Sequence, residues 1–294
     1  GSSHERPISL KSGRAVYQAL KKAGLQVVRV DTANGFHKQV KSGGLDLAFL
    51  ALHGQGGEDG TAQRLLTRAR ISYTGSDPKS SALAFDKNRA KKLFVRFGIP
   101  TPRYDLLTSK NWKQKIQKWA PPYVIKPVRE GSSIGVFFID NEFEAQRTIE
   151  SGLREYGRLM VEAKIGGREF TVGILGKLAL PVIELRPKRD FYDYEAKYTK
   201  GLTDYLIPAP ISNQLGAQLQ TLALKAHRVL GLRDFSRVDF KVDEQNRPYV
   251  LEVNSIPGFT EMSLLPKAAE YAGISFTELC LQLLEMAKAR QRKK

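Results

Sequence analysis

Short apolar segments alternate with segments of helical periodicity along most of the chain, and this alternation limits the possible folds more than any other feature. The segment 13–23 places its apolar residues on one helical face, and the segment 45–52 is almost continuously apolar. Strands that alternate with helices indicate an α/β class, and a continuously apolar strand indicates burial on both faces. We expect further strands over 25–30, 123–127, 136–139, 159–161, 170–175, 178–185, 238–242 and 249–253, and helices over 87–97 and 213–230.

Length and composition exclude several classes of protein. The chain has 294 residues, of which 41% are hydrophobic and 26% are charged, as is typical of a folded protein. We expect two or three domains, since single cores seldom reach this size. No apolar run is long enough for a transmembrane helix, and the N-terminus lacks the apolar centre of a signal peptide. The single cysteine, Cys280, excludes an internal disulfide, and we expect it in the core of a cytoplasmic protein.

The net charge of +17 raises the alternative of a nucleic-acid-binding protein. The excess of basic residues is spread over the whole chain, and the longest basic block is the C-terminal run from Arg290 to Lys294. No DNA- or RNA-binding motif accompanies it. We therefore interpret the charge as a solvated surface, since charge alone determines solubility and non-specific attraction.

A lysine at the end of a predicted strand is the first indication of chemistry. Lys126 ends the segment Tyr-Val-Ile-Lys, and a loop of small residues, 130–135, follows it. A buried lysine is costly unless an anion meets it, and a loop of small residues exposes backbone N–H groups to phosphate oxygens. The pattern predicts a nucleotide-phosphate site, although it is not a P-loop, and small residues that only form a turn would look the same.

Three oxygen-bearing side chains lie on two later strands of the prediction. Glu252 and Asn254 are two residues apart and so share one face of a strand, and Asp239 joins them if its strand pairs with theirs. Two carboxylates and an amide oxygen suit Mg²⁺ held between protein and substrate phosphates. The alternative is a set of polar positions on a solvated sheet face, which the apolar neighbours of these residues do not favour.

Seven motifs, in order along nearly the whole chain, resemble those of the D-alanine–D-alanine ligases, which are ATP-grasp enzymes. They are His4-Glu-Arg-x-Ile-Ser9, His53-Gly-x-Gly-Gly-Glu-Asp-Gly60, Asp86-Lys87, Ile125-Lys-Pro127 with Glu130-Gly-Ser-Ser133, Phe191-Tyr-Asp-Tyr-Glu-Ala-Lys-Tyr198, Arg237-x-Asp239, and Glu252-x-Asn254-x-x-Pro257-Gly258.

The resemblance implies a three-domain ATP-grasp fold: an N-terminal α/β domain over 1–77, a small central domain over 78–161, and a C-terminal domain over 162–294 that carries the metal site and a lid. ATP would bind between the last two domains. The family normally opens with a buried strand before its glycine-rich loop, whereas this sequence begins at Gly1-Ser2-Ser3-His4-Glu5, so we expect that strand to be missing.

The reaction that the resemblance implies joins two D-alanines for peptidoglycan synthesis. ATP phosphorylates the first carboxylate, the amine of the second D-alanine attacks the acyl phosphate, and ADP and phosphate are released. The implied cofactors are ATP and two Mg²⁺ or Mn²⁺ ions, and some members of the family use K⁺. A homodimer is expected on the same ground, without specific nucleic acid and without a membrane.

Site residues carry over from the family motif by motif. The implied nucleotide site comprises Lys87, Lys126, Ser132, Ser133, Glu162, Ala163, Ile165, Glu169 and Lys197, of which Glu162 meets adenine and Glu169 the ribose. The metal site comprises Asp239, Glu252 and Asn254. The substrate site comprises Glu5, His53, Arg237, Gly258, Ser263 and Leu264.

The implied catalytic residues are Glu5, Ser132, Tyr198, Arg237 and Gly258. Arg237 and the backbone N–H of Gly258 would stabilise the tetrahedral oxyanion. Tyr198, on the lid, would close a network with Ser132 and Glu5 that excludes water. The alternatives are a ligase that accepts D-lactate or D-serine as the second substrate, a basic nucleic-acid-binding protein, and a pseudoenzyme, which the intact polar set does not favour.

Overall fold

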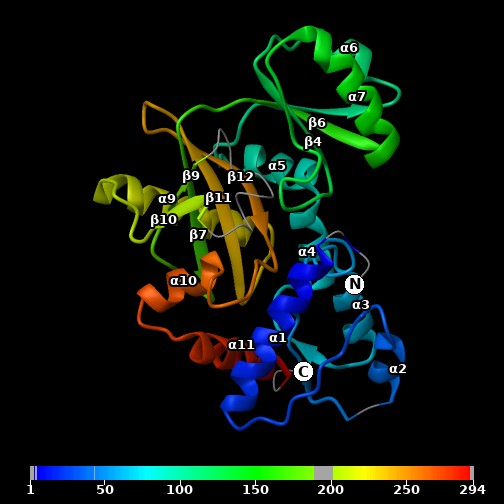
Figure 1. Cartoon of the computed structure of the whole chain (residues 1–294), viewed down its shortest axis with the longest axis vertical. Helices are drawn as coiled ribbons and strands as arrows, with labels where there is room; N and C mark the ends of the chain where they lie inside the picture. The colour runs from blue at the N-terminus through cyan, green and yellow to red at the C-terminus, as the bar shows by residue number, and fades with distance from the viewer. Residues whose placement is uncertain (1–2, 4, 43, 189–200, 292–294) are drawn as a thin grey trace.

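The fold consists of three sheets, each with its own helices (Figure 1). The computed structural model describes residues 3, 5–42, 44–188 and 201–291. A small two-stranded sheet lies in the N-terminal part, a four-stranded sheet in the central part, and a larger sheet in the C-terminal part. The mixed α/β class expected from the sequence is therefore confirmed. None of the helices in the described ranges is long and apolar enough to cross a membrane.

The helices are α1 (Arg6–Lys22), α2 (Phe36–Lys41), α3 (Thr61–Arg68), α4 (Pro78–Phe85), α5 (Lys87–Arg96), α6 (Trp112–Ile116), α7 (Glu142–Tyr156), α9 (Asn213–Val229), α10 (Leu264–Tyr271) and α11 (Phe276–Gln291). The strands are β1 (Leu47–Ala48), β2 (Ser72–Tyr73), β3 (Tyr104–Thr108), β4 (Tyr123–Pro127), β5 (Phe137–Ile139), β6 (Arg158–Ala163), β7 (Arg168–Leu175), β8 (Leu178–Ala179), β9 (Ile183–Pro187), β10 (Thr203–Leu206), β11 (Phe235–Val242) and β12 (Pro248–Asn254).

The N-terminal part departs most from the sequence prediction. The predicted strand over 25–30 is wrong, because these residues form no strand, and Leu25 and Val28 are 41% and 60% exposed. The predicted strand over 45–52 shrinks to β1, which pairs in parallel with β2 and is only half-buried. An extended segment becomes a strand only where a neighbour satisfies its backbone groups, and apolar sequence alone does not supply that neighbour.

The central sheet has the order β3-β6-β4-β5, with antiparallel neighbours throughout. Its register pairs Lys126 with Met160 and Val124 with Glu162, so Lys126 and Glu162 emerge on the same face. Helices α6 and α7 accompany this sheet at one end of the molecule (Figure 1).

The C-terminal sheet follows the path β10-β9-β7-β11-β12, and β8 also pairs with β7. The two segments predicted over 238–242 and 249–253 form the antiparallel pair β11–β12, joined by the turn at 243–247 as expected. Helix α9 packs on one face of this sheet, and α10 packs against β7.

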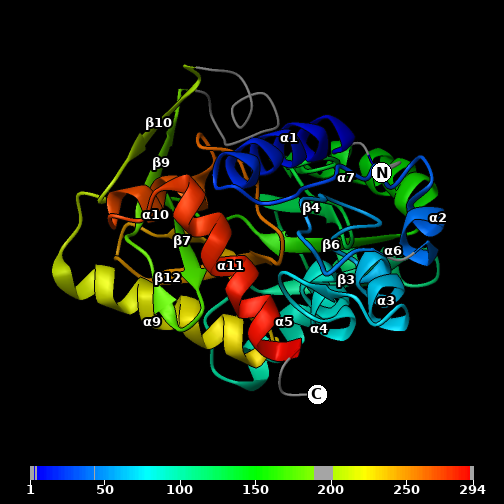
Figure 2. The same cartoon turned by 90° about the horizontal axis from the view of Figure 1, so that it is seen from below.

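Helices link the three parts into one body. Phe94 and Ile99, which the sequence assigned to the central domain, pack in a common core with Phe170 and Val238 of the C-terminal sheet. The C-terminal helix α11 packs on α1 and β2 of the N-terminal part. Figure 2 shows α11 and α1 from below. Cys280 lies fully buried in that contact, as expected. The domain boundaries at 77 and 161 stay a prediction; β6 runs on to Ala163.

Candidate active site

Four polar side chains of β11 and β12 gather on one sheet face. Asp239 pairs with Glu252, and Arg237 pairs with Asn254, in the antiparallel register. Paired residues point to the same side of a sheet, so all four side chains emerge together. The prediction that the three oxygen-bearing residues share one face is confirmed; metal binding by them stays a prediction.

A bulge in β12 makes this grouping possible. The pairing passes from Asp239 opposite Glu252 to Phe240 opposite Val250, so Leu251 has no partner on β11. Because of this extra residue, both Val250 and Val253 reach the core, where they are almost fully buried. Strict alternation would have placed one of these two valines on the polar face.

Asp239 accepts several hydrogen bonds at this face. Its carboxylate accepts two hydrogen bonds from the Arg237 guanidinium, at 2.8 Å and 2.7 Å, and one from Asn254 Nδ2 at 3.0 Å. Thr171 Oγ1 also lies within hydrogen-bond distance of it, at 2.6 Å. These bonds hold the carboxylate in one orientation beside Glu252.

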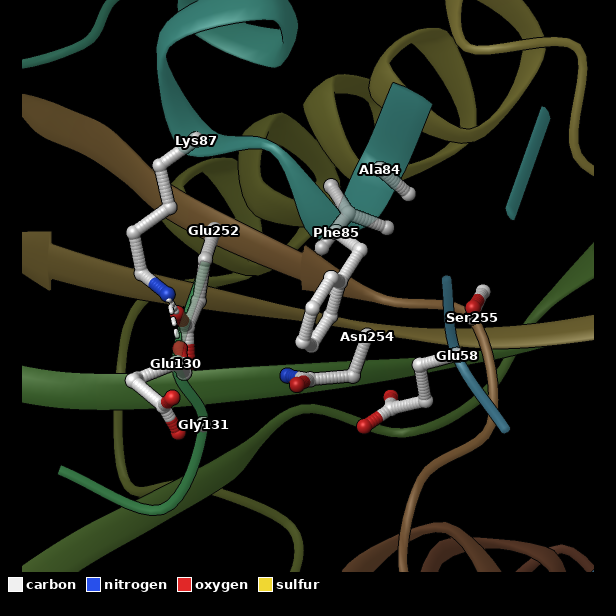
Figure 3. A pocket seen from close by; sticks show the side chains of 10 residues that line it. Glu58, Ala84, Phe85, Lys87, Glu130, Gly131, Glu252, Asn254 and Ser255 are labelled. Atoms are coloured by element: carbon white, nitrogen blue, oxygen red, sulfur yellow. Dashed lines mark hydrogen bonds and ion pairs between the residues drawn. The ribbon is translucent and has the colours of Figure 1, made fainter. Parts of the chain in front are cut away.

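Lys87 brings a cation to the same face from the start of α5. Its Nζ lies 3.1 Å from Glu252 Oε2 and also donates to the backbone carbonyl of Glu130 (Figure 3). Asp86 positions it, because its side chain caps α5 by accepting from the backbone N–H of Arg89. The same Asp86 accepts from Arg129 Nε at 3.0 Å, which fixes the helix start to the central sheet.

The loop that follows β4 meets the N-terminal part of the chain. Ser132 Oγ donates to the carboxylate of Glu5, and both Ser132 and Ser133 have positive φ, at 53° and 60°. Glycines border this carboxylate on two sides: a Cβ added to Gly54 would lie 2.6 Å from Glu5 Oε2, and one added to Gly131 would lie 2.8 Å from it. Left-handed backbone at non-glycine residues is uncommon and is frequent at ligand-binding loops.

Glu162 forms a buried charge cluster on the face of the central sheet. Its Oε1 lies 2.8 Å from Lys126 Nζ and its Oε2 lies 2.6 Å from Lys91 Nζ. Burial alone would raise the pKa of Glu162, but the two ammonium groups outweigh it and the pKa is lowered. The carboxylate of Glu162 thus pairs with two cations. Burial, together with the neighbouring charge of Lys126, lowers the pKa of Lys91 to about 8.

Glu58 is a second buried carboxylate, and it lines the cavity beside Glu252 and Asn254 (Figure 3). Its Oε2 accepts from the backbone N–H of Gly54 at 2.8 Å. Burial raises the pKa of Glu58 to about 8, and the nearby carboxylate of Glu5 acts in the same direction. Glu58 therefore holds its proton at neutral pH.

The remaining predicted site residues take varied positions. His53 is buried, with both ring nitrogens bonded inside the protein. Glu169 pairs with Lys241 at 2.9 Å. The backbone N–H of Ala163 already donates to Arg103, while Ile165 is half-buried nearby. Ser263 precedes α10 and Leu264 begins it. Lys197 and Tyr198 of the predicted lid lie outside the described residues.

Sequence reasoning missed three residues that the structure brings to the site or to its supports: Ser12, Glu58 and Lys91. Lys91 carried a usable signal, because it shares a helical face with Lys87 one turn earlier, beside the buried Phe94. The sequence signal for Glu58 was weaker: it is an acidic residue inside a glycine-dense loop. Ser12 carried none, because the groups it binds lie far away in sequence.

Comparison with known proteins decides the family. The family described as "D-ala D-ala ligase N-terminus" matches residues 29–76, and "D-ala D-ala ligase C-terminus" matches residues 93–285. A D-alanine–D-alanine ligase of Methylacidiphilum infernorum is 43% identical over 99% of this chain and 94% of its own length. The chain belongs to the D-alanine–D-alanine ligase family.

Solved structures of the family agree with the fold described above. The D-alanine–D-alanine ligase of Bacillus anthracis complexed with ATP has a TM-score of 0.88 at 30% identity, covering 100% of this chain and 96% of that one. A D-Ala:D-Ser ligase of Enterococcus faecalis has a TM-score of 0.74 at 35% identity, covering 82% of this chain and 73% of that one. The ATP-grasp fold that the motifs implied is confirmed.

Proposed function

We propose that this protein uses ATP to join two D-alanines. A phosphoryl group passes from ATP to a carboxylate oxygen of the first D-alanine, and ADP leaves. The amine of the second D-alanine then attacks the acyl carbon, phosphate departs, and the proton lost by the amine goes to solvent. The observation that carries this proposal is the convergence of the polar β11–β12 face with Lys87 and the loop after β4 around one cavity.

Groups of opposite charge in this site suit the two kinds of substrate, ATP and D-alanine. Lys126 and Lys91 surround Glu162 on the nucleotide side, where the net charge of the three groups is positive and suits a phosphate-bearing ligand. Glu5 belongs to a different part of the site, where its carboxylate can accept from an ammonium group. Glu5 pairs with the ammonium of the first D-alanine, and Ser132 keeps its carboxylate in place.

The β11–β12 face fits divalent cations. Asp239 and Glu252 lie directly opposite each other on paired strands, so a cation between them would meet two carboxylates. The described residues contain no group of three or more His, Cys, Asp or Glu that could hold a metal ion. Mg²⁺ commonly takes one or two carboxylates together with substrate phosphates and water. Asp239, Glu252 and Asn254 would hold Mg²⁺ or Mn²⁺, which neutralises phosphate charge when bound.

Arg237 and the backbone N–H of Gly258 would act on the negative charge that develops on the acyl oxygen when the amine attacks. Donors fixed before the reaction stabilise an oxyanion without reorganising, which is why they lower the barrier. Lys197 and Tyr198 would close the lid over this site. A homodimer, a requirement for K⁺ and a cytoplasmic location stay expectations from the family.

Phosphate release from ATP tests the proposal. We expect release with D-alanine, with little when D-lactate or D-serine replaces the second substrate, and mass spectrometry should show the dipeptide. Release that is independent of D-alanine, or a product formed mainly with D-serine or D-lactate, would contradict the proposed product.

Glu252→Gln tests the metal assignment. It keeps the side-chain volume but removes one negative charge, so turnover should fall at least 100-fold, which is about 2.7 kcal/mol of barrier. Glu244→Gln, in the exposed turn between the same two strands, is the matched control and should retain activity. A Glu252→Gln enzyme with more than half of wild-type turnover would remove Glu252 from the proposed site.

A further inference from the structure

A chain of hydrogen bonds begins and ends on the backbone segment 256–259. Ser12 Oγ, fully buried on α1, accepts from the backbone N–H of Phe259 at 3.1 Å. The same oxygen lies 2.9 Å from His53 Nε2, and His53 Nδ1 lies 3.0 Å from the carbonyl oxygen of Ile256. Two residues of the N-terminal part thus bridge both ends of a short loop in the C-terminal part.

The chemistry of the groups fixes the direction of every proton in this chain. Burial lowers the pKa of His53 to about 4, so the imidazole is neutral at pH 7 and has one donor and one acceptor. A carbonyl can only accept, so Nδ1–H donates to Ile256. Nε2 must then accept the Ser12 hydroxyl proton, and the Ser12 oxygen is left to accept from Phe259. All four groups are satisfied in one arrangement.

The loop held in this way is also fixed by packing. The Phe259 ring contacts Phe49, Phe235 and Phe276, with ring centroids 5.3 Å, 5.7 Å and 5.7 Å away. Proline at 257 restricts the backbone between the two bonded ends. His53 is itself held, because its backbone N–H donates to Ser9 Oγ at 3.0 Å. Gly258 therefore lies between two backbone groups that cannot move independently.

We infer that Ser12 and His53 are positioning residues that aim the backbone N–H of Gly258 at the reacting carbonyl. The inference rests on the proposed ligase function and on the role of Gly258 in it. Donors to an oxyanion are effective only within a few tenths of an ångström of their best position. A loop held at both ends should therefore stabilise the transition state more than it strengthens substrate binding. Ser12 thereby contributes to chemistry that it does not touch.

Ser12→Ala tests this directly, because it leaves the Phe259 N–H and His53 Nε2 without partners. We expect kcat to fall 10- to 100-fold, affinity for a tetrahedral phosphinate inhibitor to fall in parallel, and the KM values for ATP and D-alanine to stay within about threefold. A kcat within twofold of wild type with unchanged phosphinate affinity overturns the inference. Equal losses in kcat and ATP affinity also overturn it, because they indicate general damage.

Ser236→Ala is the matched control. Ser236 is also fully buried and pairs with a buried histidine, His227 Nδ1, at 2.7 Å, but this pair joins α9 to β11 and does not reach the loop. Its unfolding midpoint should fall as for Ser12→Ala, while kcat and phosphinate affinity stay within about threefold of wild type. A control that loses phosphinate affinity as strongly as Ser12→Ala overturns the inference.

Amide hydrogen exchange in the unmodified protein gives a test that needs no variant. The Phe259 N–H should exchange as slowly as the amides of β11, and rapid exchange would overturn the inference even if Ser12→Ala does not fold. These outcomes separate the two proposals. A wild-type protein without ligase activity contradicts the proposed function, whereas an active enzyme that is indifferent to Ser12→Ala contradicts the inference alone.

Discussion

Glu162 and Glu58 are both almost fully buried carboxylates at the site, with side chains of the same kind in opposite electrostatic settings. Glu162 has two lysine ammonium groups within 2.8 Å of its oxygens, and its pKa is lowered despite burial. Glu58 has a backbone N–H donor and acidic neighbours, and burial raises its pKa to about 8. Burial opposes the charged form at both sites, so the neighbouring charges decide which carboxylate keeps its charge.

The two carboxylates also differ in role: Glu162 connects structural elements of the site, whereas Glu58 lines its cavity. The Glu162 cluster joins α5, β4 and β6, and Lys91 extends it through Thr101 to the backbone carbonyl of Val250 on β12. It therefore ties the central sheet to the strand that carries Glu252. Glu58 makes no such bridge of charges, and its neutral carboxyl leaves the acidic side of the cavity with less repulsion.

Glu162→Gln should give the largest effect, because it leaves two buried ammonium groups without their counter-charge. We expect the free energy of unfolding to fall by about 3 kcal/mol or more. Denaturant unfolding at pH 7 measures it, and Glu285→Gln, at an exposed side chain on α11, should change little in comparison. A loss below about 1 kcal/mol would mean that the lysines do not depend on Glu162.

Lys91→Met serves as the internal check on that result. When Lys91 is already absent, Glu162→Gln leaves one unpaired lysine instead of two, so the double variant should lose less stability than the two single losses added together. The coupling expected for residues in direct contact is about 0.5–3 kcal/mol. Strict additivity would contradict the shared cluster.

Glu58 should also make the free energy of unfolding depend on pH. Its pKa of about 8 in the folded state lies above the usual value of about 4.3, so the folded state holds the proton more tightly between these values. The resulting stability is complete below about pH 4.3 and is lost as pH rises through 8, with a slope of at most about 1.4 kcal/mol per pH unit. Glu5 and Glu252 face the same region and oppose ionisation further.

The measurement is the unfolding free energy of wild type minus that of Glu58→Gln between pH 5 and pH 9 without divalent cations, which cancels other titrating groups. Wild type should lose stability relative to the variant as pH rises. A difference that is flat with pH, or that rises, would show that Glu58 is ionised in the folded protein.

The smallest expected effect is that of Glu58→Gln near pH 4, where the carboxyl is protonated in the folded state and largely protonated in the unfolded state. A protonated carboxyl and an amide have the same charge and nearly the same shape, so stability should change by less than about 1 kcal/mol. The same substitution at Glu162 is the contrast that sharpens this result. A loss at Glu58 as large as that at Glu162 would remove the distinction between the two carboxylates.

Local signals in the sequence were reliable where the structure depends on neighbours along the chain. Asp86 caps α5 as predicted, and Ser275 and Glu278 form the predicted capping box of α11. The strand over 123–127 has the predicted limits. In each case the deciding contact lies within a few residues, so residue type and spacing specify it.

Features that depend on distant partners could not be found in this way. The segment 25–30 has a strand-like sequence, but it pairs with no strand in the part of the chain that the structure describes. Ser12 resembles any other helical serine in sequence. Its role depends on the hydrogen bond from the backbone N–H of Phe259, which lies 247 residues further along the chain. Lys91 differs from its exposed neighbour Lys92 in its contacts with Glu162 and Thr101, which reach it from other elements.

The bulge at Leu251 determines where β12 could lose one residue without a change in the pairing of the site. Loss of this residue would restore a regular ladder and still leave Glu252 opposite Asp239 and Val250 opposite Phe240. Loss of Val253 would instead turn the carboxylate of Glu252 or the amide of Asn254 toward the core. A one-residue deletion at the bulge therefore keeps the pairing of the site, whereas a deletion between Glu252 and Asn254 would move one polar side chain from the cavity to the core.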